Sequence, residues 1–143
     1  MAVILIVEDE VFVRKNAEWL VEDLGHFALS AQDEREALAH LSSAQLIDAL
    51  FVDIRLGPAC GGGYEVAREG VKRHPHLRVL YASGSNLSAE MSGQFVCGGQ
   101  FLQKPYSQEQ LEMAVGALLS RSPSDGPDVT VTPDSRQDTP LQL

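Results

Sequence analysis

Short apolar runs alternate with segments of helical spacing along most of this chain, and the alternation limits the fold more than any other feature. The run that ends at Asp53 has four successive apolar residues, which is typical of a strand buried on both faces. Strands that alternate with helices form a parallel sheet through right-handed crossovers, with helices on both faces. The expected strands are Val3–Val7, Phe27–Ala31, Asp48–Asp53, Arg78–Ala82 and Gln100–Gln103.

The segments between these runs have the spacing of amphipathic helices. Asp33 is suited to cap the second helix, with Glu36 at the position of a capping box, and Gly25 is suited to end the first. We expect the glycines and the proline of residues 56–63 to exclude regular structure. Tyr64 and Trp19 stand among apolar neighbours at helical spacing and are expected in or beside the core. The expected helices are Val11–Leu24, Asp33–Leu41, Tyr64–Arg73, a weak segment Asn86–Gln94, and Ser107–Leu119.

The length and composition indicate one folded domain followed by a tail. The chain has 143 residues and is 44% apolar, which is sufficient for a continuous core without disulfides. Residues 1–121 are expected to fold. Residues 122–143 are rich in Ser, Pro, Thr and Asp and are expected to be disordered. About twenty residues are too few to form an output domain.

Several classes of protein are disfavoured by the same composition. No apolar run is long enough to cross a membrane, and the N-terminus lacks the basic residues of a signal peptide. Cys60 and Cys97 form no CxxC motif, so we expect reduced thiols in a cytoplasmic protein. The formal net charge is −9 and the few Lys and Arg residues are scattered, which argues against direct binding of nucleic acid.

Chemically versatile side chains follow four of the expected strands. Glu8 and Asp9 follow the first, Asp53 ends the third, Ser83 follows the fourth and Lys104 the fifth. In a doubly wound sheet of order 2-1-3-4-5 the first and third strands are neighbours, so the three carboxylates would meet at one edge. Like charges at such distances repel unless a cation lies among them, and Mg²⁺ prefers oxygen ligands of this kind.

These groups are the components of phosphoryl transfer. A carboxylate can attack phosphorus in line, while a metal ion and an ammonium group neutralise charge on the equatorial oxygens. A hydroxyl such as that of Ser83 can donate a hydrogen bond to the same oxygens. The sequence therefore predicts phosphoryl-transfer chemistry at this edge of the sheet.

At this point the motifs resemble a known family. Val-Glu-Asp-Glu after the first strand, Phe-Val-Asp at the third, Ala-Ser-Gly at the fourth and Lys-Pro-Tyr at the fifth are similar to a response-regulator receiver domain. The resemblance extends from Ala2 to about Arg121. It implies a flavodoxin-like fold with a five-stranded parallel sheet of order 2-1-3-4-5, in a stand-alone, chemotaxis-regulator-like response regulator of two-component systems.

The resemblance implies a role for each matched residue. Asp53 corresponds to the phosphoaccepting aspartate. Glu8 and Asp9 correspond to the acidic pair that holds Mg²⁺ or Mn²⁺ together with Asp53, with Asp9 the direct ligand of the pair. Arg55 would contribute its backbone carbonyl to the metal.

The remaining matched residues would read the phosphorylation state. Ser83 corresponds to the switch hydroxyl and Lys104 to the lysine that pairs with the phosphoryl group. Phe101 corresponds to the aromatic residue that rotates inward after phosphorylation. Pro105 is a candidate for a cis peptide bond.

The family also implies partners. A sensor histidine kinase or a histidine phosphotransfer protein would supply the phosphoryl group, and the output would be a protein–protein contact in the cytoplasm. The contact would involve an unidentified target or a second copy through the fourth helix, fifth strand and fifth helix. Such a protein is a signalling domain that assists its own phosphorylation and dephosphorylation only, and is not otherwise an enzyme.

The sequence departs from the family pattern beside the acceptor. Receiver domains usually have Met-Pro soon after it, whereas Leu56-Gly57-Pro58 is followed here by Ala-Cys-Gly-Gly-Gly. Arg55 also places a bulky cation at the second position after Asp53. There are two alternatives to the function of a receiver domain. A phosphohydrolase of the haloacid-dehalogenase type has a second acid at that position, so it is disfavoured. A receiver-like binding module that is never phosphorylated stays open.

Overall fold

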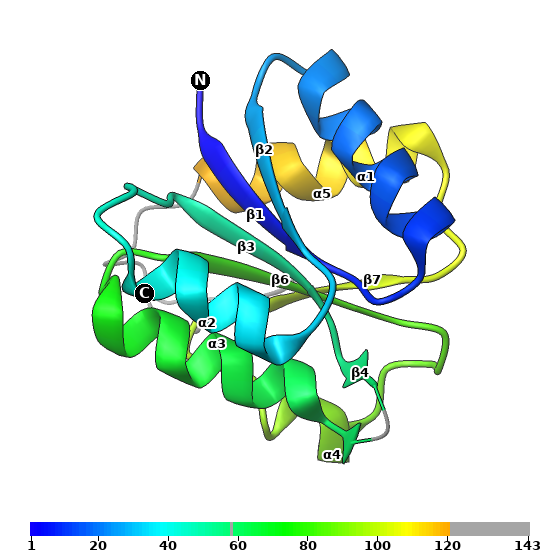
Figure 1. Ribbon diagram of the computed structural model, residues 1–143. Coiled ribbons are helices and arrows are strands. Elements are labelled where there is room, and N and C mark those ends of the chain that lie inside the picture. The colour runs from blue at the N-terminus through cyan, green and yellow to red at the C-terminus, as the bar shows by residue number, and fades with distance from the viewer. Residues whose placement is uncertain (58, 121–143) are drawn as a thin grey trace, which may run out of the picture.

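The computed structural model describes residues 1–57 and 59–120, and it contains the expected parallel sheet (Figure 1). Five strands pair in the order β2-β1-β3-β6-β7. Since β4 and β5 are short additions outside this sheet, the order is 2-1-3-4-5 for its own strands, which confirms the prediction. The strands are β1 (Val3–Val7), β2 (Phe27–Ala31), β3 (Ala49–Asp53), β6 (Arg78–Ser83) and β7 (Gln100–Gln103).

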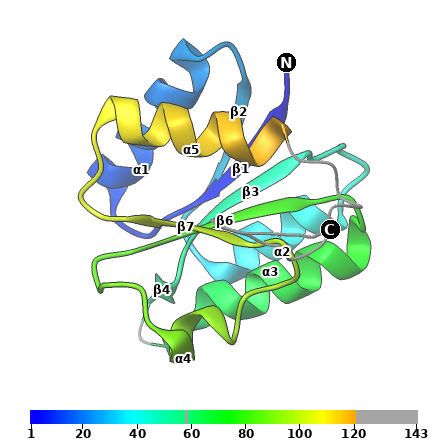
Figure 2. The same ribbon diagram turned by 180° about the vertical axis from the view of Figure 1, so that it is seen from behind.

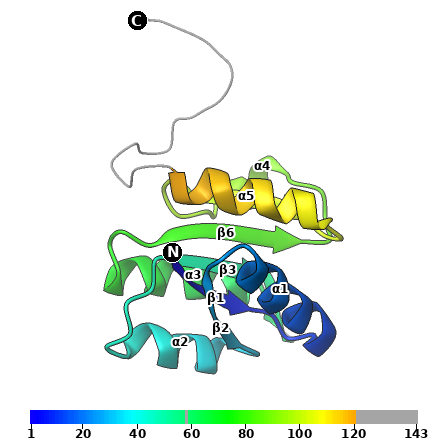
Figure 3. The same ribbon diagram turned by 90° about the horizontal axis from the view of Figure 1, so that it is seen from above.

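Helices cover both faces of the sheet. Figures 1 and 2 show α1 and α5 on one face and α2, α3 and α4 on the other. In Figure 3 the strand β6 lies between α5 and α3. The helices are α1 (Val11–Asp23), α2 (Glu34–Ser42), α3 (Gly62–Arg73), α4 (Ala89–Ser92) and α5 (Gln108–Ser120).

The core consists of two clusters of buried side chains, one on each face. Successive residues of a strand point to opposite faces, so Leu5 and Val7 pack with α2 and α3, whereas Ile4 and Ile6 pack with α1 and α5. This division explains why β1 and β3 are apolar at almost every position. Burial on both faces leaves their carboxyl ends as the first positions where polar side chains are tolerated.

Local signals at the helix ends agree with the structure. Asp33 accepts a hydrogen bond from the Glu36 N–H at 2.8 Å, and Glu36 accepts one from the Gln32 N–H at 2.9 Å. Gly25 follows α1 with a φ of 94°, a conformation that glycine adopts without steric cost. The predicted cap and the predicted helix end are thus confirmed.

The prediction that residues 56–63 have no regular structure was wrong. The short strands β4 (Arg55–Leu56) and β5 (Ala59–Cys60) pair antiparallel, and α3 begins at Gly62 rather than Tyr64. Gly57 has a φ of 61°, which allows the chain to reverse within a few residues. The two short extended segments therefore pair as a hairpin.

Two further expectations need correction. The weak helix at residues 86–94 contracts to the four residues of α4, which Ser88 caps by accepting from the Met91 N–H. Trp19 is 59% exposed and lies outside the core, because Ala17, Leu20 and Val21 form the buried side of α1. Tyr64 is buried as expected.

Some predictions fall outside this structure. Pro58 and the tail, including the predicted disorder of residues 122–143, lie outside the described residues. Cys97 has a free thiol. Within residues 1–57 and 59–120, none of the helices combines the length and the apolar character that a membrane span requires.

Candidate functional site

The carboxyl ends of β1 and β3 place three acidic side chains together. Val7 pairs with Val52 across the two parallel strands, so Glu8 follows one strand where Asp53 ends the other. Carboxylate oxygens of Glu8, Asp9 and Asp53 lie within 4.8 Å of one another. Glu8 is 5% and Asp53 7% exposed, whereas Asp9 is exposed. The sequence prediction of an acidic cluster at this edge is correct in its placement.

Lys104 reaches the same cluster from the end of β7. Its Nζ lies 3.0 Å from Glu8 Oε1 and 3.3 Å from Asp53 Oδ2. The Lys104 N–H donates to the Ser83 carbonyl at 2.8 Å, which continues the pairing of β6 and β7 up to the site. One ammonium group therefore bridges two buried carboxylates. We call Glu8, Asp9, Asp53 and Lys104 the acid cluster.

Each of the three carboxylates also accepts a hydrogen bond from a backbone N–H group. The Glu10 N–H donates to Glu8 Oε2 at 3.1 Å, so both oxygens of Glu8 have a partner. The Arg55 N–H donates to Asp53 Oδ1 at 3.3 Å, and the Gly57 N–H donates to Asp9 Oδ2 at 3.0 Å. Among the described residues no hydrogen bond reaches Asp9 Oδ1. Of the acidic pair, Asp9 is thus the residue with a free carboxylate oxygen among the described residues.

The electrostatics of the acid cluster are unbalanced. Burial raises the pKa of both Asp53 and Glu8 above the ordinary range, although contacts with Lys104 oppose the increase. Burial alone would lower the pKa of Lys104, but the hydrogen bond to Glu8 and the charge of Asp53 outweigh it and raise that pKa. Three carboxylates share a single nearby ammonium group. A hard divalent cation fits this set of oxygen donors, because it would supply the missing positive charge.

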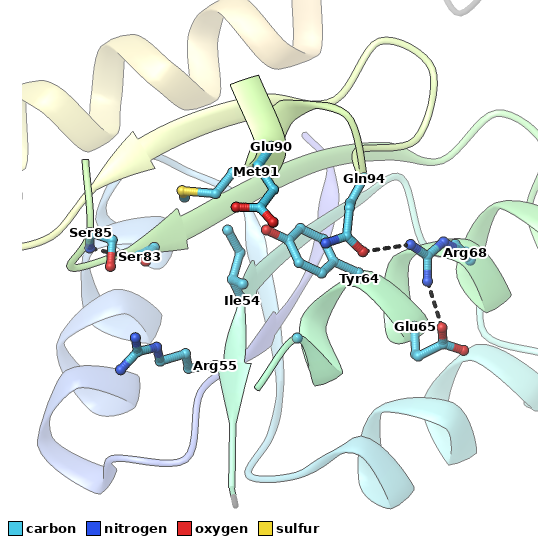
Figure 4. Close-up of a pocket in the computed structure, with 11 residues that line it drawn as sticks. Ile54, Arg55, Tyr64, Glu65, Arg68, Ser83, Ser85, Glu90, Met91 and Gln94 are labelled. Carbon is cyan, nitrogen blue, oxygen red and sulfur yellow. Dashed lines mark hydrogen bonds and ion pairs between the residues drawn. The ribbon is translucent and has the colours of Figure 1, made fainter. Parts of the chain in front are cut away.

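Ser83 and Arg55 lie beside the acid cluster, at the rim of a pocket of about 510 Å³. Ser83 is buried at the end of β6, where its Oγ accepts a hydrogen bond from the Ser85 N–H at 3.1 Å. Arg55 has an exposed side chain at the start of β4. In Figure 4 it lies at the opposite end of the pocket from Arg68, with Tyr64 between them. The pocket therefore separates the two arginines.

Comparison with known proteins identifies the family. Residues 4–116 match the family model described as the response regulator receiver domain. The chain belongs to this family. Receiver domains are signalling modules of two-component systems, bind Mg²⁺ at an acidic pocket, and interact with histidine kinases or phosphotransfer proteins and with downstream targets.

Individual relatives agree with this assignment. Protein PilG of Pseudomonas aeruginosa is 27% identical over 128 residues, which covers 87% of this chain and 90% of PilG. A crystal structure of a response regulator receiver protein from Sinorhizobium medicae has a TM-score of 0.74 and 29% identity, covering 83% of this chain and 94% of that one. A probable transcriptional regulator, ycf27 of Guillardia theta, is 28% identical over 119 residues. The match covers 83% of this chain and 46% of ycf27, so this chain spans about half the length of that relative.

The aromatic residue expected to act as a switch belongs to a larger stack in this receiver domain. Phe101 is half-buried on β7, and its ring centroid lies 6.4 Å from that of Phe95. Phe95 in turn stacks on Tyr81 at 4.1 Å, with an interplanar angle of 15°. Tyr64 of α3 adds a fourth ring, 5.8 Å from Tyr81. We call Tyr64, Tyr81, Phe95 and Phe101 the aromatic cluster.

Sequence reasoning missed Phe95, Tyr81 and the constraint that holds them. The Tyr81 hydroxyl accepts a hydrogen bond from the Val96 N–H at 2.9 Å. A side chain at Gly99 would place its Cβ 2.8 Å from a ring carbon of Tyr81. The segment after α4 lacks periodicity, so its single aromatic residue gave no signal. A single aromatic residue in a short segment bounded by glycines was the available hint.

Gly63 is a second residue that the sequence analysis treated only as part of a loop. A Cβ at this position would lie 2.2 Å from the Asp53 carbonyl oxygen and 2.8 Å from Ile54 Cα. The Gly63 N–H donates to the Ile54 carbonyl at 3.0 Å. The first turn of α3 thus packs directly on the backbone that carries Asp53, and only glycine fits there.

The other side of the acid cluster opens into a groove of about 560 Å³. The Lys104–Pro105 peptide bond is cis, the form for which the resemblance made Pro105 a candidate. Tyr106 packs against Phe51 with ring centroids 5.7 Å apart, and burial beside Glu8 raises its pKa to about 12. The groove is lined by Phe12, Val13, Asn16, Gly84, Lys104, Pro105 and Tyr106.

Proposed function

We propose that this receiver domain accepts a phosphoryl group on Asp53 from the phosphohistidine of a sensor kinase or a histidine phosphotransfer protein. The observation that carries the proposal is the convergence of Glu8, Asp9, Asp53 and Lys104 at one edge of the sheet. Asp9, Asp53 and the backbone carbonyl of Arg55 would hold Mg²⁺ or Mn²⁺, with Glu8 beside them. When bound, the ion neutralises charge on the acceptor and on the transferred group.

The transfer step follows from the positions of these side chains. A carboxylate oxygen of Asp53 attacks phosphorus, the phosphorus–nitrogen bond breaks, and the imidazole nitrogen keeps the electron pair and takes a proton. The Arg55 N–H already holds Asp53 Oδ1, which fixes the carboxylate for attack. Lys104 lies 3.3 Å from Asp53 Oδ2 and would exchange this contact for one with a phosphoryl oxygen.

The donor would approach through the groove on the α1 side. Phe12 is 84% exposed and lines the groove together with Lys104 and Tyr106, so an apolar rim leads to the acid cluster. An apolar surface beside a reacting group suits a protein donor that must dock, whereas a small donor needs only access. Phe12→Asp should therefore slow transfer from a phosphohistidine protein about tenfold and leave phosphorylation by acetyl phosphate unchanged.

Phosphorylation would be read on the other side of the site. A phosphoryl group brings a charge of about −2 at neutral pH, and the Ser83 hydroxyl would turn from Ser85 to donate to it. Movement of Ser83 would allow Phe101 to rotate inward and change the surface of α4, β7 and α5. A protein target or a second copy of the chain would recognise that surface. Such coupling is typically about 1–3 kcal/mol.

The expected setting is the cytoplasm, and the output is a protein–protein contact. The net charge of −9 and the scattered basic residues favour a protein partner over nucleic acid. Apart from assisting its own phosphorylation and dephosphorylation, the domain would act as a phosphoacceptor and not as an enzyme.

The proposal is tested by intact mass after incubation with acetyl phosphate, with and without Mg²⁺. Wild type and the control Glu10→Gln should gain one phosphoryl group only when Mg²⁺ is present, and Asp53→Asn should gain none. Glu10 is a suitable control because its exposed acidic side chain takes no part in the acid cluster, and Glu10→Gln keeps the backbone N–H that donates to Glu8. The absence of an adduct on wild type would favour a phosphorylation-independent binding module. Steady hydrolysis of phosphate esters would favour the phosphohydrolase.

A further inference from the structure

Arg14 contacts residues 8–10, the acidic loop that follows β1, without being part of the acid cluster. Its Nη1 donates to the Glu8 carbonyl oxygen at 2.9 Å, and its side chain is only 13% exposed. This carbonyl belongs to the peptide unit that joins Glu8 to Asp9. A donor fixed on that unit limits rotation of the backbone between the two acids, and so limits the directions in which both carboxylates point.

Glu18 lies near the Arg14 guanidinium, one helical turn further along α1. Glu18 Oε2 lies 4.0 Å from Arg14 Nε, and this oxygen is buried without a hydrogen-bond partner among the described residues. A buried carboxylate oxygen in this condition is costly, so the arrangement does not serve stability alone. The pair is explained if its role is to keep the guanidinium aimed at the acidic loop.

Charge alone does not account for Arg14 at this position. A cation beside a site for Mg²⁺ repels the ion and lowers its affinity. The planar guanidinium fork, in contrast, provides directed donors on a side chain that stays charged when it is partly buried. The electrostatic effect and the positioning effect of Arg14 on Mg²⁺ binding therefore have opposite signs.

We propose that Arg14 is a positioning residue for the metal site, with Glu18 as its support. Arg14 fixes the peptide unit between Glu8 and Asp9, which directs the free oxygen of Asp9 toward Asp53. The inference rests on the proposed function, since it concerns how tightly the acid cluster holds Mg²⁺.

Lys15 provides a matched control. Its Nζ also lies 4.0 Å from a Glu18 oxygen, and it carries the same charge on the next residue of α1. Its side chain is 67% exposed, and among the described residues it forms an ion pair with Glu18 and none with the acidic loop. Lys15→Ala thus removes one positive charge near the site but leaves the positioning contact intact.

The test is a calorimetric Mg²⁺ titration of the full chain at fixed ionic strength, with thermal unfolding to show that each variant is folded. Arg14→Ala should weaken Mg²⁺ binding about tenfold or more, in the range found for residues that orient metal ligands. Lys15→Ala should bind Mg²⁺ as tightly as wild type or slightly more tightly. Arg14→Lys keeps the charge and loses the fork, so any weakening in this variant reports positioning alone.

The outcomes separate this inference from the proposed function. If wild type binds Mg²⁺ and both Arg14 variants bind it equally well or better, the positioning role is wrong and the metal site stands. If wild type does not bind Mg²⁺, the metal assignment and the inference fail together. Weaker binding by Arg14→Lys with normal binding by Lys15→Ala would establish the role, even if Arg14→Ala failed to fold.

Discussion

The acid cluster lies at the carboxyl ends of β1 and β3, whereas the aromatic cluster packs with the core on the α3 face of the sheet, and the two are built in opposite ways. The acid cluster joins four charged side chains, of which burial leaves two carboxylates with raised pKa values. The aromatic cluster joins four rings with little polar character, and its one tightly held hydroxyl has a backbone partner. The acid cluster is short of positive charge. In the aromatic cluster the rings are packed and the Tyr81 hydroxyl has its hydrogen bond.

This difference indicates how the two clusters can respond. A charge deficit can be relieved by an ion or altered by a phosphoryl group without moving the backbone, because the ligands are already in place. A packed stack can change only by repacking, and each ring pair contributes about 0.5–1.5 kcal/mol beyond the area it buries. We therefore expect the acid cluster to bind and the aromatic cluster to respond, with Ser83 between them.

Gly63→Ala should have the largest effect, because it disturbs the backbone that carries Asp53. The added Cβ would lie 2.2 Å from the Asp53 carbonyl oxygen, so α3 or the end of β3 must move. We expect a loss of about 3 kcal/mol in the free energy of unfolding, measured in urea, together with weaker Mg²⁺ binding.

Gly116→Ala is the control for this variant. Gly116 lies inside α5, where an added Cβ meets nothing within 4 Å. Ala at this position should stabilise the protein by about 0.5–1 kcal/mol, since glycine is unfavourable in a helix. Equal stability of the two variants would show that α3 is not seated tightly on the acceptor strand.

Phe95→Ala should separate the two clusters. It removes the ring between Phe101 and Tyr81 and should cost about 2 kcal/mol in urea unfolding, less than a fully buried Phe would. Mg²⁺ affinity should stay unchanged, while the phosphorylation-dependent shifts of β7 in NMR spectra should be reduced. Phe12→Ala, at an exposed site, should change stability by less than about 0.5 kcal/mol. A large fall in Mg²⁺ affinity in Phe95→Ala would contradict the division of roles.

The two clusters also differ in how far the sequence predicts them. Glu8, Asp9, Asp53 and Lys104 stand directly at strand ends, and the topology of a parallel sheet brings strand ends to one edge. Their meeting could therefore be inferred from their places at the strand ends once the strand order 2-1-3-4-5 was assumed. The order itself was what the resemblance to receiver domains implied.

The aromatic cluster could not be inferred in this way. Phe95 lies in a glycine-rich segment after α4, and its place on Tyr81 depends on a close approach of the backbone that Gly99 permits. The prediction for residues 56–63 was wrong for a similar reason. A hairpin as short as β4–β5 depends on the local φ of Gly57, which the sequence pattern does not show. Trp19 was misplaced because apolar neighbours along the sequence do not share a face of the helix. Arg14 stands at a polar position of α1, and that position alone gives no sign of its contact with the Glu8 carbonyl.

Asp53→Asn should stabilise the metal-free protein by about 1–2 kcal/mol at neutral pH. It removes a buried charge that burial and Asp9 both disfavour, and Lys104 keeps its contact with Glu8. The pKa of Asp53 is raised in the folded state, so between the unfolded and the folded pKa the folded state binds more protons and stability falls as pH rises. The cost is fully present above the folded pKa and absent below the ordinary value of 3.8.

Thermal unfolding without metal, from pH 7 to pH 4, would check this prediction. The difference in stability between Asp53→Asn and wild type should shrink as the pH falls. Saturating Mg²⁺ should reverse it, because an ion at about 100 times its dissociation constant contributes about 2.7 kcal/mol to wild type. If wild type is the more stable protein without metal at neutral pH, the acid cluster is not short of positive charge.

Tyr81→Phe should have the smallest effect and the plainest contrast with Asp53→Asn. The Val96 N–H loses its acceptor, at a cost of about 1 kcal/mol in urea unfolding, while the stack on Phe95 remains. Burial raises the pKa of Tyr81 to about 12, so its hydroxyl is neutral at pH 6 and at pH 9 and the loss should be the same at both. Since the acid cluster is untouched, Mg²⁺ should stabilise this variant as much as it stabilises wild type. A loss that changed between the two pH values would mean that the hydroxyl is coupled to the charges across β6, and the two clusters would then have to be treated as one.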